Sequence, residues 1–235
     1  KKCVLFGVTS LCFVIAFLLL PACAPASRET TDARGFWTPK DPPGAAYVFD
    51  VKIGVDGEEV SVAAAGTIAL TNTASRPLSV LAFEWTVKPT SEFAASVSGR
   101  PLTVLNGDKN MPLTTPLLLA LPEPVRPGEK VKLDVRFTHK AAVSNGQVHL
   151  GLWYPRLWRE GMPARDSFRV KLETPPEFVA AASGRLDQAS GAYINDYVTS
   201  YFGLFLSSTM RMERRETGGV EITALFTEKG RECAL

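Results

Sequence analysis

Apolar and polar residues alternate at every second position in a series of segments along this chain. The clearest run is residues 131–137, VKLDVRF, and the pattern recurs at 47–53, 81–87, 168–172 and 220–226. A period of two is typical of a β-strand with one buried face and one solvated face. No window of twelve or more residues after the N-terminal leader shows a clear 3.6-residue period, so the sequence predicts an all-β protein.

Turn signals separate these segments at intervals typical of a sandwich or an open barrel. They include Arg126-Pro127-Gly128-Glu129, Asn145-Gly146, Pro175-Pro176 and Gly218-Gly219. Proline cannot donate to a sheet ladder, and Asn-Gly favours a tight hairpin. We therefore expect an antiparallel sandwich or an open saddle-like sheet, which follows an N-terminal apolar signal helix. The last two segments, around 210–226, are expected to form a hairpin.

The N-terminal residues have the pattern of an export signal, in which Lys1-Lys2 precede an apolar stretch over residues 3–20. A stretch of about 18 apolar residues is also long enough for an uncleaved membrane anchor. The sequence Leu20-Pro21-Ala22-Cys23 resembles a bacterial lipobox, which implies cleavage after Ala22 and acylation of Cys23. Two or three acyl chains anchor a protein stably, whereas one does not. We expect a lipid-anchored protein of the bacterial cell envelope, with Cys23 in the membrane and the β domain outside the cytoplasm.

Residues 24–45 contain four prolines among small and polar residues, which indicates a flexible linker. Within it, Phe36-Trp37 could dock on the domain or on lipid headgroups, and the sequence does not decide between them. The expected organisation is a signal peptide over 1–22, an acylated cysteine and linker over 23–45, and a β domain over 46–235.

Charge and cysteine usage narrow the function classes. The formal net charge is +2, and two of the lysines lie in the segment expected to be removed, so the mature chain is near neutral. Nucleic-acid binding needs a basic surface and is not expected. Of the four cysteines, only Cys233 would remain as a thiol, so no internal disulfide can form. Cys233 could be a reactive thiol, but a buried strand residue in a chain cut short is the favoured interpretation.

Motifs for catalysis are not found in the sequence. The two histidines, His139 and His149, belong to no His-Glu-x-x-His sequence, and no cysteine pair has zinc-ligand spacing. Glu160 and Asp166 flank Arg165 and could serve acid–base chemistry, but a surface ion pair is the simpler interpretation.

The aromatic group Trp153, Tyr154 and Trp158 could stack on a ligand, although such residues more often pack internally. We therefore expect no catalytic residue and no metal ligand in this chain.

The order of motifs from Tyr47 to Glu228 resembles the N-terminal β domain of the aminopeptidase N family of zinc metallopeptidases. The resemblance rests on a set of short motifs that occur in the family's order: the strand Tyr47–Ile53, Gly66–Asn72, Pro127-Gly128-Glu129, Trp153-Tyr154-Pro155, the strand Asp166–Leu172, Pro175–Phe178, Ala182–Gly184, and the passage Phe202–Phe226 with Arg211–Arg215 and Gly219-Val220.

This resemblance implies a non-catalytic accessory domain. In the family, the zinc ligands and the glutamate base lie in a following thermolysin-like domain, and the N-terminal domain packs on it. The present sequence stops at Leu235 without that motif. We expect a truncated or partial chain that is inactive alone, with zinc only in a missing catalytic domain, which could follow on the same chain or be separate. The alternative is a complete cell-envelope lipoprotein that acts as a binding or scaffolding module.

Overall fold

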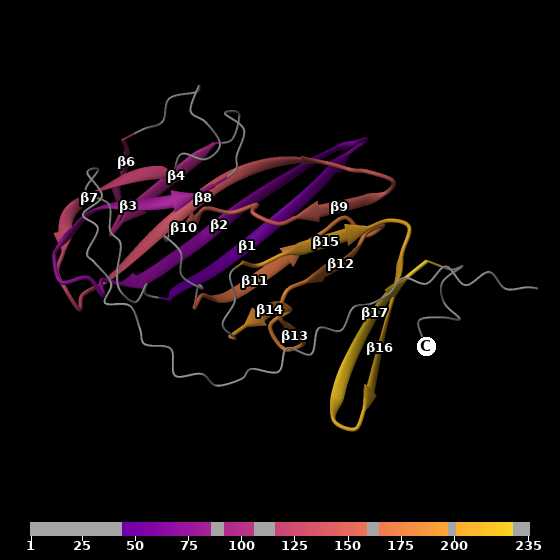
Figure 1. Ribbon diagram of the computed structural model, residues 1–235. Helices are drawn as coiled ribbons and strands as arrows, with labels where there is room; N and C mark the ends of the chain where they lie inside the picture. Colours follow the sequence, from indigo (N-terminus) through magenta and orange to yellow (C-terminus); the bar gives the residue numbers. More distant parts are fainter. Residues whose placement is uncertain (1–43, 86–91, 106–115, 159–164, 197–200, 228–235) are drawn as a thin grey trace, which may run out of the picture. The chain divides into compact units, whose positions relative to one another are not determined.

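A computed structural model of the chain describes residues 44–85, 92–105, 116–158, 165–196 and 201–227. The contacts divide the chain into Lys1–Thr31 and Asp32–Leu235, and every described residue belongs to the second unit. These residues form strands, turns and loops, which confirms the all-β prediction (Figure 1). None of the described residues forms a helix that could span a bilayer.

The largest sheet has eight strands, and its central strands are long. In spatial order it consists of β13 (Arg185–Asp187), β14 (Ala192–Asn195), β11 (Ser167–Glu173), β1 (Ala45–Asp56), β2 (Glu59–Thr71), β8 (Lys130–Ala142), β4 (Phe93–Val97) and β5 (Arg100–Pro101).

Two smaller sheets consist of antiparallel strands. One consists of β10 (Arg156–Leu157), β3 (Leu78–Glu84), β7 (Leu117–Val125) and β6 (Thr103–Val104), and the other of β12 (Val179–Ala182), β15 (Leu204–Ser207) and β9 (Gln147–Leu150). The expected terminal hairpin is present as β16 (Arg211–Thr217) and β17 (Val220–Phe226), joined at Gly218-Gly219.

Strands β1 and β2 form the hairpin at the centre of the large sheet. Their register runs without a slip from Ala45↔Leu70 to Asp56↔Glu59, so the loop is Gly57-Glu58. Gly57 has φ 59°, a conformation that glycine adopts without strain. At Gly66, an added Cβ would lie 1.9 Å from the carbonyl oxygen of Val48, so β2 passes β1 too closely for any side chain.

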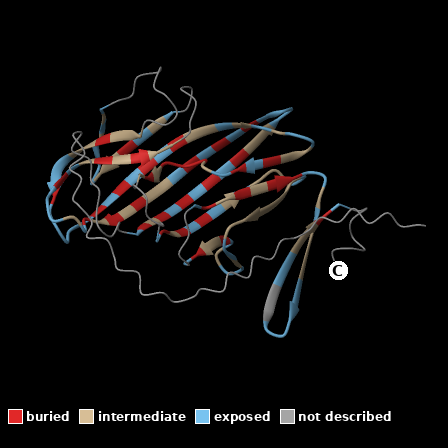
Figure 2. Cartoon of the chain, viewed as in Figure 1, coloured by how far each residue is buried: buried red, intermediate tan, exposed pale blue. Residues whose placement is uncertain are grey.

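Alternation along the strands divides the large sheet into two faces (Figure 2). The inner face carries the buried residues of β1, β2 and β8, and the intervening residues are mostly exposed. The inner face shares one core cluster with buried residues of the smaller sheets, such as Phe83 and Leu119 from one and Leu150 and Leu206 from the other. One feature was not predicted: β1 pairs with β11 in parallel, while the other ladders are antiparallel.

Candidate functional site

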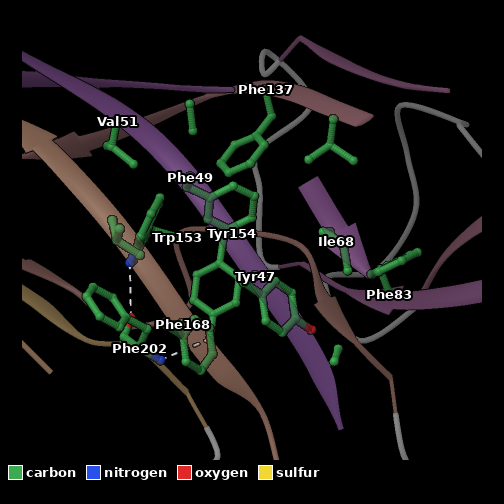
Figure 3. Packing of buried hydrophobic residues seen from close by; sticks show 14 of the residues in the cluster. Tyr47, Phe49, Val51, Ile68, Phe83, Phe137, Trp153, Tyr154, Phe168 and Phe202 are labelled. Atoms are coloured by element: carbon green, nitrogen blue, oxygen red, sulfur yellow. Dashed lines mark hydrogen bonds between the residues drawn. The ribbon is translucent and has the colours of Figure 1, made fainter. Parts of the chain in front are cut away.

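Two of the three aromatic residues singled out in the sequence, Trp153 and Tyr154, lie in the core, whereas Trp158 is half-buried and outside the core cluster. Trp153 and Tyr154 are fully buried, and their rings contact Phe49 on the inner face of the large sheet (Figure 3). Tyr47 stacks on Phe168 with ring centroids 4.9 Å apart and an interplanar angle of 9°. The expectation that Trp153 and Tyr154 mainly pack is confirmed, so they offer no face to a ligand.

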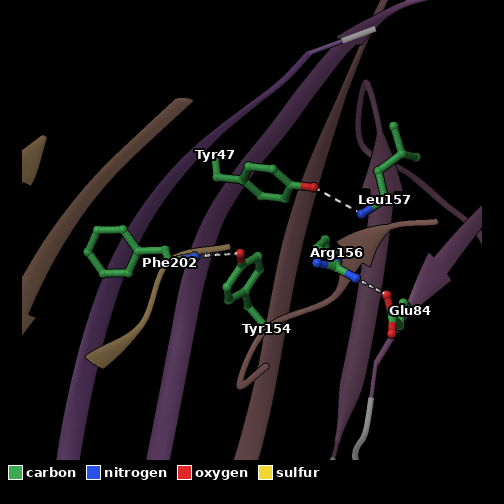
Figure 4. Close-up of polar contacts among 6 residues, drawn as sticks. All are labelled: Tyr47, Glu84, Tyr154, Arg156, Leu157 and Phe202. Carbon is green, nitrogen blue, oxygen red and sulfur yellow. Dashed lines mark hydrogen bonds and ion pairs between the residues drawn. The ribbon is translucent and has the colours of Figure 1, made fainter. Parts of the chain in front are cut away.

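The polar atoms of this segment join the three sheets (Figure 4). The Tyr154 hydroxyl accepts a hydrogen bond from the backbone N–H of Phe202 at 3.0 Å, and Trp153 Nε1 donates to the Phe202 carbonyl at 3.1 Å. The Tyr47 hydroxyl accepts from the N–H of Leu157 at 2.9 Å, and Arg156 pairs with Glu84. Buried N–H groups without partners cost free energy, so these bonds fix the segment in place.

Asn72 has a similar structural role at the end of β2. Its side-chain nitrogen donates to the carbonyls of Arg76 and Val125 at 2.9 and 2.8 Å, and its oxygen accepts from the N–H of Ala74. Its backbone also bonds to both residues of the Gly128-Glu129 turn. The Asn72 side chain therefore holds two loops together.

The carboxylate prediction needs a correction. Asp166 is only 2% exposed, and its Oδ1 accepts a hydrogen bond from the N–H of Ala45 at 2.9 Å. Asp166 is thus buried at the start of β1, and a surface ion pair is wrong for it. Arg165 is exposed, and Glu160 lies outside the described residues.

The two histidines line one shallow pocket but face different surroundings. His149 is exposed between the buried Val148 and Leu150, and its ring contacts Phe205. His139 is half-buried, and burial lowers its pKa below the ordinary value of 6.5. Its Nδ1 has no hydrogen-bond partner among the described residues. Two histidines without further ligands do not make a metal centre, and within the described ranges no three His, Cys, Asp or Glu residues are grouped to hold an ion.

The outer face of the large sheet carries a groove of about 800 Å³, which we call the alanine groove. Its floor includes Ala63, Ala65 and Ala94, and its sides carry longer side chains from the neighbouring strands: Asp50, Lys52, Arg136, Thr138, Lys171 and Glu173. Ala65 pairs with Asp50 on one side and with Arg136 on the other. Small side chains between long ones produce the hollow, which the sequence analysis did not identify.

The terminal hairpin β16–β17 is hydrogen-bonded to no other strand in the described part of the chain. Its strands pair from Arg211↔Phe226 to Thr217↔Val220. Ile222 is 53% exposed, although it occupies the apolar face of β17. Tyr201, before β15, is exposed to the same degree. A two-stranded hairpin is marginal alone, and Ile222 is the exposed large apolar residue that the described part of this hairpin presents.

The predicted lipidation residue Cys23 and the cleavage residue Ala22 lie outside the described residues, as does Cys233. Those three predictions are not tested by the structure.

Comparison with known proteins reveals similarity at the level of structure. No known protein family and no curated sequence matches the chain. Solved structures do match. A mutant M1 zinc metallopeptidase from Deinococcus radiodurans, bound to a Tyr-Ser-Ala substrate, aligns over 79% of this chain and 48% of its own at 16% identity, with a TM-score of 0.54.

Two further structures give the same result. A two-domain M1 zinc metallopeptidase mutant bound to L-tryptophan aligns over 80% of this chain and 48% of its own, at 15% identity and a TM-score of 0.52. The M1 zinc metallopeptidase from Deinococcus radiodurans, in a structure without that mutation, aligns over 79% of this chain and 46% of its own, at 16% identity and a TM-score of 0.51. The chain therefore has the fold of the N-terminal domain of these metallopeptidases and spans about half of their length.

Proposed function

We propose that the chain is the non-catalytic N-terminal β domain of a lipid-anchored, aminopeptidase-like metallopeptidase. The fold supports this, because it corresponds to about half of proteins that carry a zinc peptidase activity. The observation that carries the proposal is the β16–β17 hairpin. It exposes Ile222 and is hydrogen-bonded to no other strand among the described residues, as expected of an element that completes its packing against a second domain.

In this proposal the chain supplies packing surface and no reacting group. The hydroxyls of Tyr47 and Tyr154 are used in internal hydrogen bonds, and the described residues group no metal ligands. Zinc would be held by the catalytic domain, which either follows on the same chain or is a separate protein.

The decisive experiment is to determine the coding sequence that follows codon 235. An in-frame continuation that contains His-Glu-x-x-His would support the proposal. An immediate stop codon, with no peptidase that binds the chain, would contradict it and favour the alternative of a complete cell-envelope lipoprotein that serves as a binding module.

A biochemical test complements the gene sequence. The full chain with added zinc should not release an aminoacyl-p-nitroanilide product, whereas the chain combined with its catalytic domain should. Ile222→Asp should weaken that combination without unfolding the chain, because Ile222 is exposed. The exposed control Val48→Asp, on the outer face of the large sheet, should leave it unchanged.

The anchoring part of the proposal rests on Leu20-Pro21-Ala22-Cys23 and has its own test. In a bacterial host, mass spectrometry of the mature N-terminus should find Cys23 acylated and residues 1–22 removed. Cys23→Ser should abolish acylation and shift the protein out of the membrane fraction. An unmodified cysteine on an uncleaved chain would contradict the anchoring proposal.

A further inference from the structure

The alanine groove has an unpaired charge on each of its two sides. Asp50 on β1 and Arg136 on β8 are both exposed, and both lie beside Ala65 in the sheet register. Two strand spacings separate their backbones by about 10 Å. Neither side chain forms an ion pair or a hydrogen bond with another described residue, whereas Lys52 in the same lining pairs with Glu173 at 3.0 Å. The groove therefore offers one carboxylate and one guanidinium to a binding partner.

The floor of the groove suits a long side chain that enters from above. Ala63, Ala65 and Ala94 are all exposed, so their methyl groups form an open apolar floor. Stacked sheets lie about 10 Å apart, and the space between them is filled where a long side chain of one sheet faces a small one of the other. The aliphatic part of an arginine packs on methyl groups while its guanidinium keeps a polar partner. An arginine that enters over Ala65 finds that partner in Asp50, its neighbour on β1.

The same face carries such an arginine. Arg136 has Ala65 and Ala94 as its neighbours in the sheet, so its own strand partners give it no anion. A two-fold symmetric contact occurs twice, and one patch must therefore hold both a group and its complement. If the two-fold axis runs parallel to the strands, between β2 and β8, Arg136 of each copy faces Ala65 of the other and reaches Asp50. The same axis places Lys52 opposite Glu92, because Ala63, which pairs with Lys52, also pairs with Thr138, which bonds to Glu92.

The charge and the size of this face are compatible with a pair of copies. The groove lining contains equal numbers of cations and anions: Lys52, Arg136, Lys171, Asp50, Glu92 and Glu173. Two copies therefore do not repel each other through the net charge of the lining. Strands β11, β1, β2, β8 and β4 lie side by side (Figure 1). Five strands over the length of β11 cover about 24 by 24 Å, and two such faces bury on the order of 1,000 Å², the lower range of a specific interface.

We infer that two copies of this chain pack outer face to outer face as a weak two-fold symmetric dimer, in which Arg136 of each copy enters the alanine groove of the other and pairs with its Asp50. The exchanged charge pairs fix the register of the two sheets more than they add affinity. None of these residues belongs to the β16–β17 hairpin, so the dimer does not depend on the proposed function.

Light scattering combined with absorbance and refractive index tests this inference, because it gives the protein mass in a micelle separately from the detergent. The full chain in dodecylmaltoside should reach the mass of two copies as its concentration is raised through the micromolar range. Asp50→Arg and Arg136→Asp each bring like charges together across the interface. Each should raise the dissociation constant by more than about tenfold and leave single copies at the same concentration.

A mixture of the two variants is the specific test. In a mixed pair, the introduced arginine meets the introduced aspartate, and the remaining Arg136 meets the remaining Asp50. Unlike copies therefore attract while like copies repel, and an equimolar mixture should regain the mass of two copies.

The matched controls are Asp56→Arg and Lys132→Asp, which lie on the same two strands, exposed and outside the groove lining. Each should pair as the unchanged chain does. Circular dichroism checks that every variant is folded. If a charge reversal in the groove unfolds the chain, Ala65→Gln replaces it, because a longer side chain on the floor should also leave single copies.

Three results would overturn the inference. The first is an unchanged chain that keeps the mass of one copy throughout the micromolar range. The second is a mass of two copies in both groove variants, which would assign the contact to another surface. The third is a mixture of the two folded variants that stays as single copies, because the exchanged pair of Asp50 and Arg136 would then not hold the copies together.

Discussion

The hydroxyl of Tyr154 offers the sharpest test of how the sheets are joined. Tyr154→Phe keeps the ring, which packs edge-on to Tyr47, Trp153 and Phe168, and removes the acceptor of the 3.0 Å hydrogen bond from Phe202 N–H. Both residues are 0% exposed, so water cannot replace that acceptor. A buried donor left without a partner costs about 1–3 kcal/mol. We expect this loss in the free energy of unfolding, a large part of the 5–15 kcal/mol typical of a domain.

Urea denaturation followed by tryptophan fluorescence and by circular dichroism measures the loss in the full chain. Tyr193→Phe is the graded control, because its hydroxyl donates to the Ala180 carbonyl at 3.1 Å from a half-buried position. Water can solvate that carbonyl in the variant, so Tyr193→Phe should lower the free energy of unfolding by less than about 1 kcal/mol. Equal stability of the chain and Tyr154→Phe within about 0.5 kcal/mol would show that the segment does not join the sheets as described.

The remaining predictions concern the sheet, the half-buried histidine and the hairpin. Gly66→Ala should lower the free energy of unfolding by about 2–3 kcal/mol, because the added Cβ would collide with the Val48 carbonyl oxygen. Gly151→Ala is the control and should leave stability unchanged, because nothing lies within 4 Å of the added Cβ. Similar losses in the two variants would contradict the close approach of β1 and β2 at Gly66. Burial lowers the pKa of His139 below 6.5, so the unfolded state binds the proton more readily, and stability should fall as the pH drops below 6.5, down to the lowered pKa. When the free energy of unfolding is measured against pH, it should fall less in His139→Gln than in the unchanged chain, whereas the exposed control His149→Gln should show the full fall. If His139→Gln showed the full fall as well, the pH dependence would belong to another group. Backbone amides of β16–β17 should exchange with deuterium much faster than those of β1–β2, and equal protection would argue against a hairpin that lacks neighbours.

Sequence periodicity predicted several of the strands, β1, β8 and β11 of the large sheet among them, because the inner face is consistently apolar. Val131–Phe137 and Phe168–Leu172 show a clean alternation, and both are long strands of the large sheet. Asn145-Gly146 predicted a tight turn, and both residues have positive φ there, at 52° and 70°. The terminal hairpin was predicted for the same reason, since its glycines separate two alternating runs.

Pairing between distant segments could not be predicted from local patterns. The parallel partner of β1 is β11, which lies more than a hundred residues later, and no local signal specifies that partner. Asp166 was expected at the surface because its neighbours are charged, yet the N–H of Ala45 at the start of β1 requires a buried acceptor there. The alanine groove was missed for a related reason, since it exists only when β1, β2 and β8 lie side by side.

The motifs that carry the family resemblance have structural tasks in this chain. Trp153-Tyr154 bonds to Phe202, Asn72 joins two loops, and Gly66 permits the close approach of β1 and β2. Residues of this kind specify a fold, and a fold can serve several functions. The similarity to M1 metallopeptidases is therefore evidence about architecture. Evidence about function has to come from surfaces that the fold does not need, and on the described residues the two clearest are the exposed side of the hairpin at Ile222 and the alanine groove.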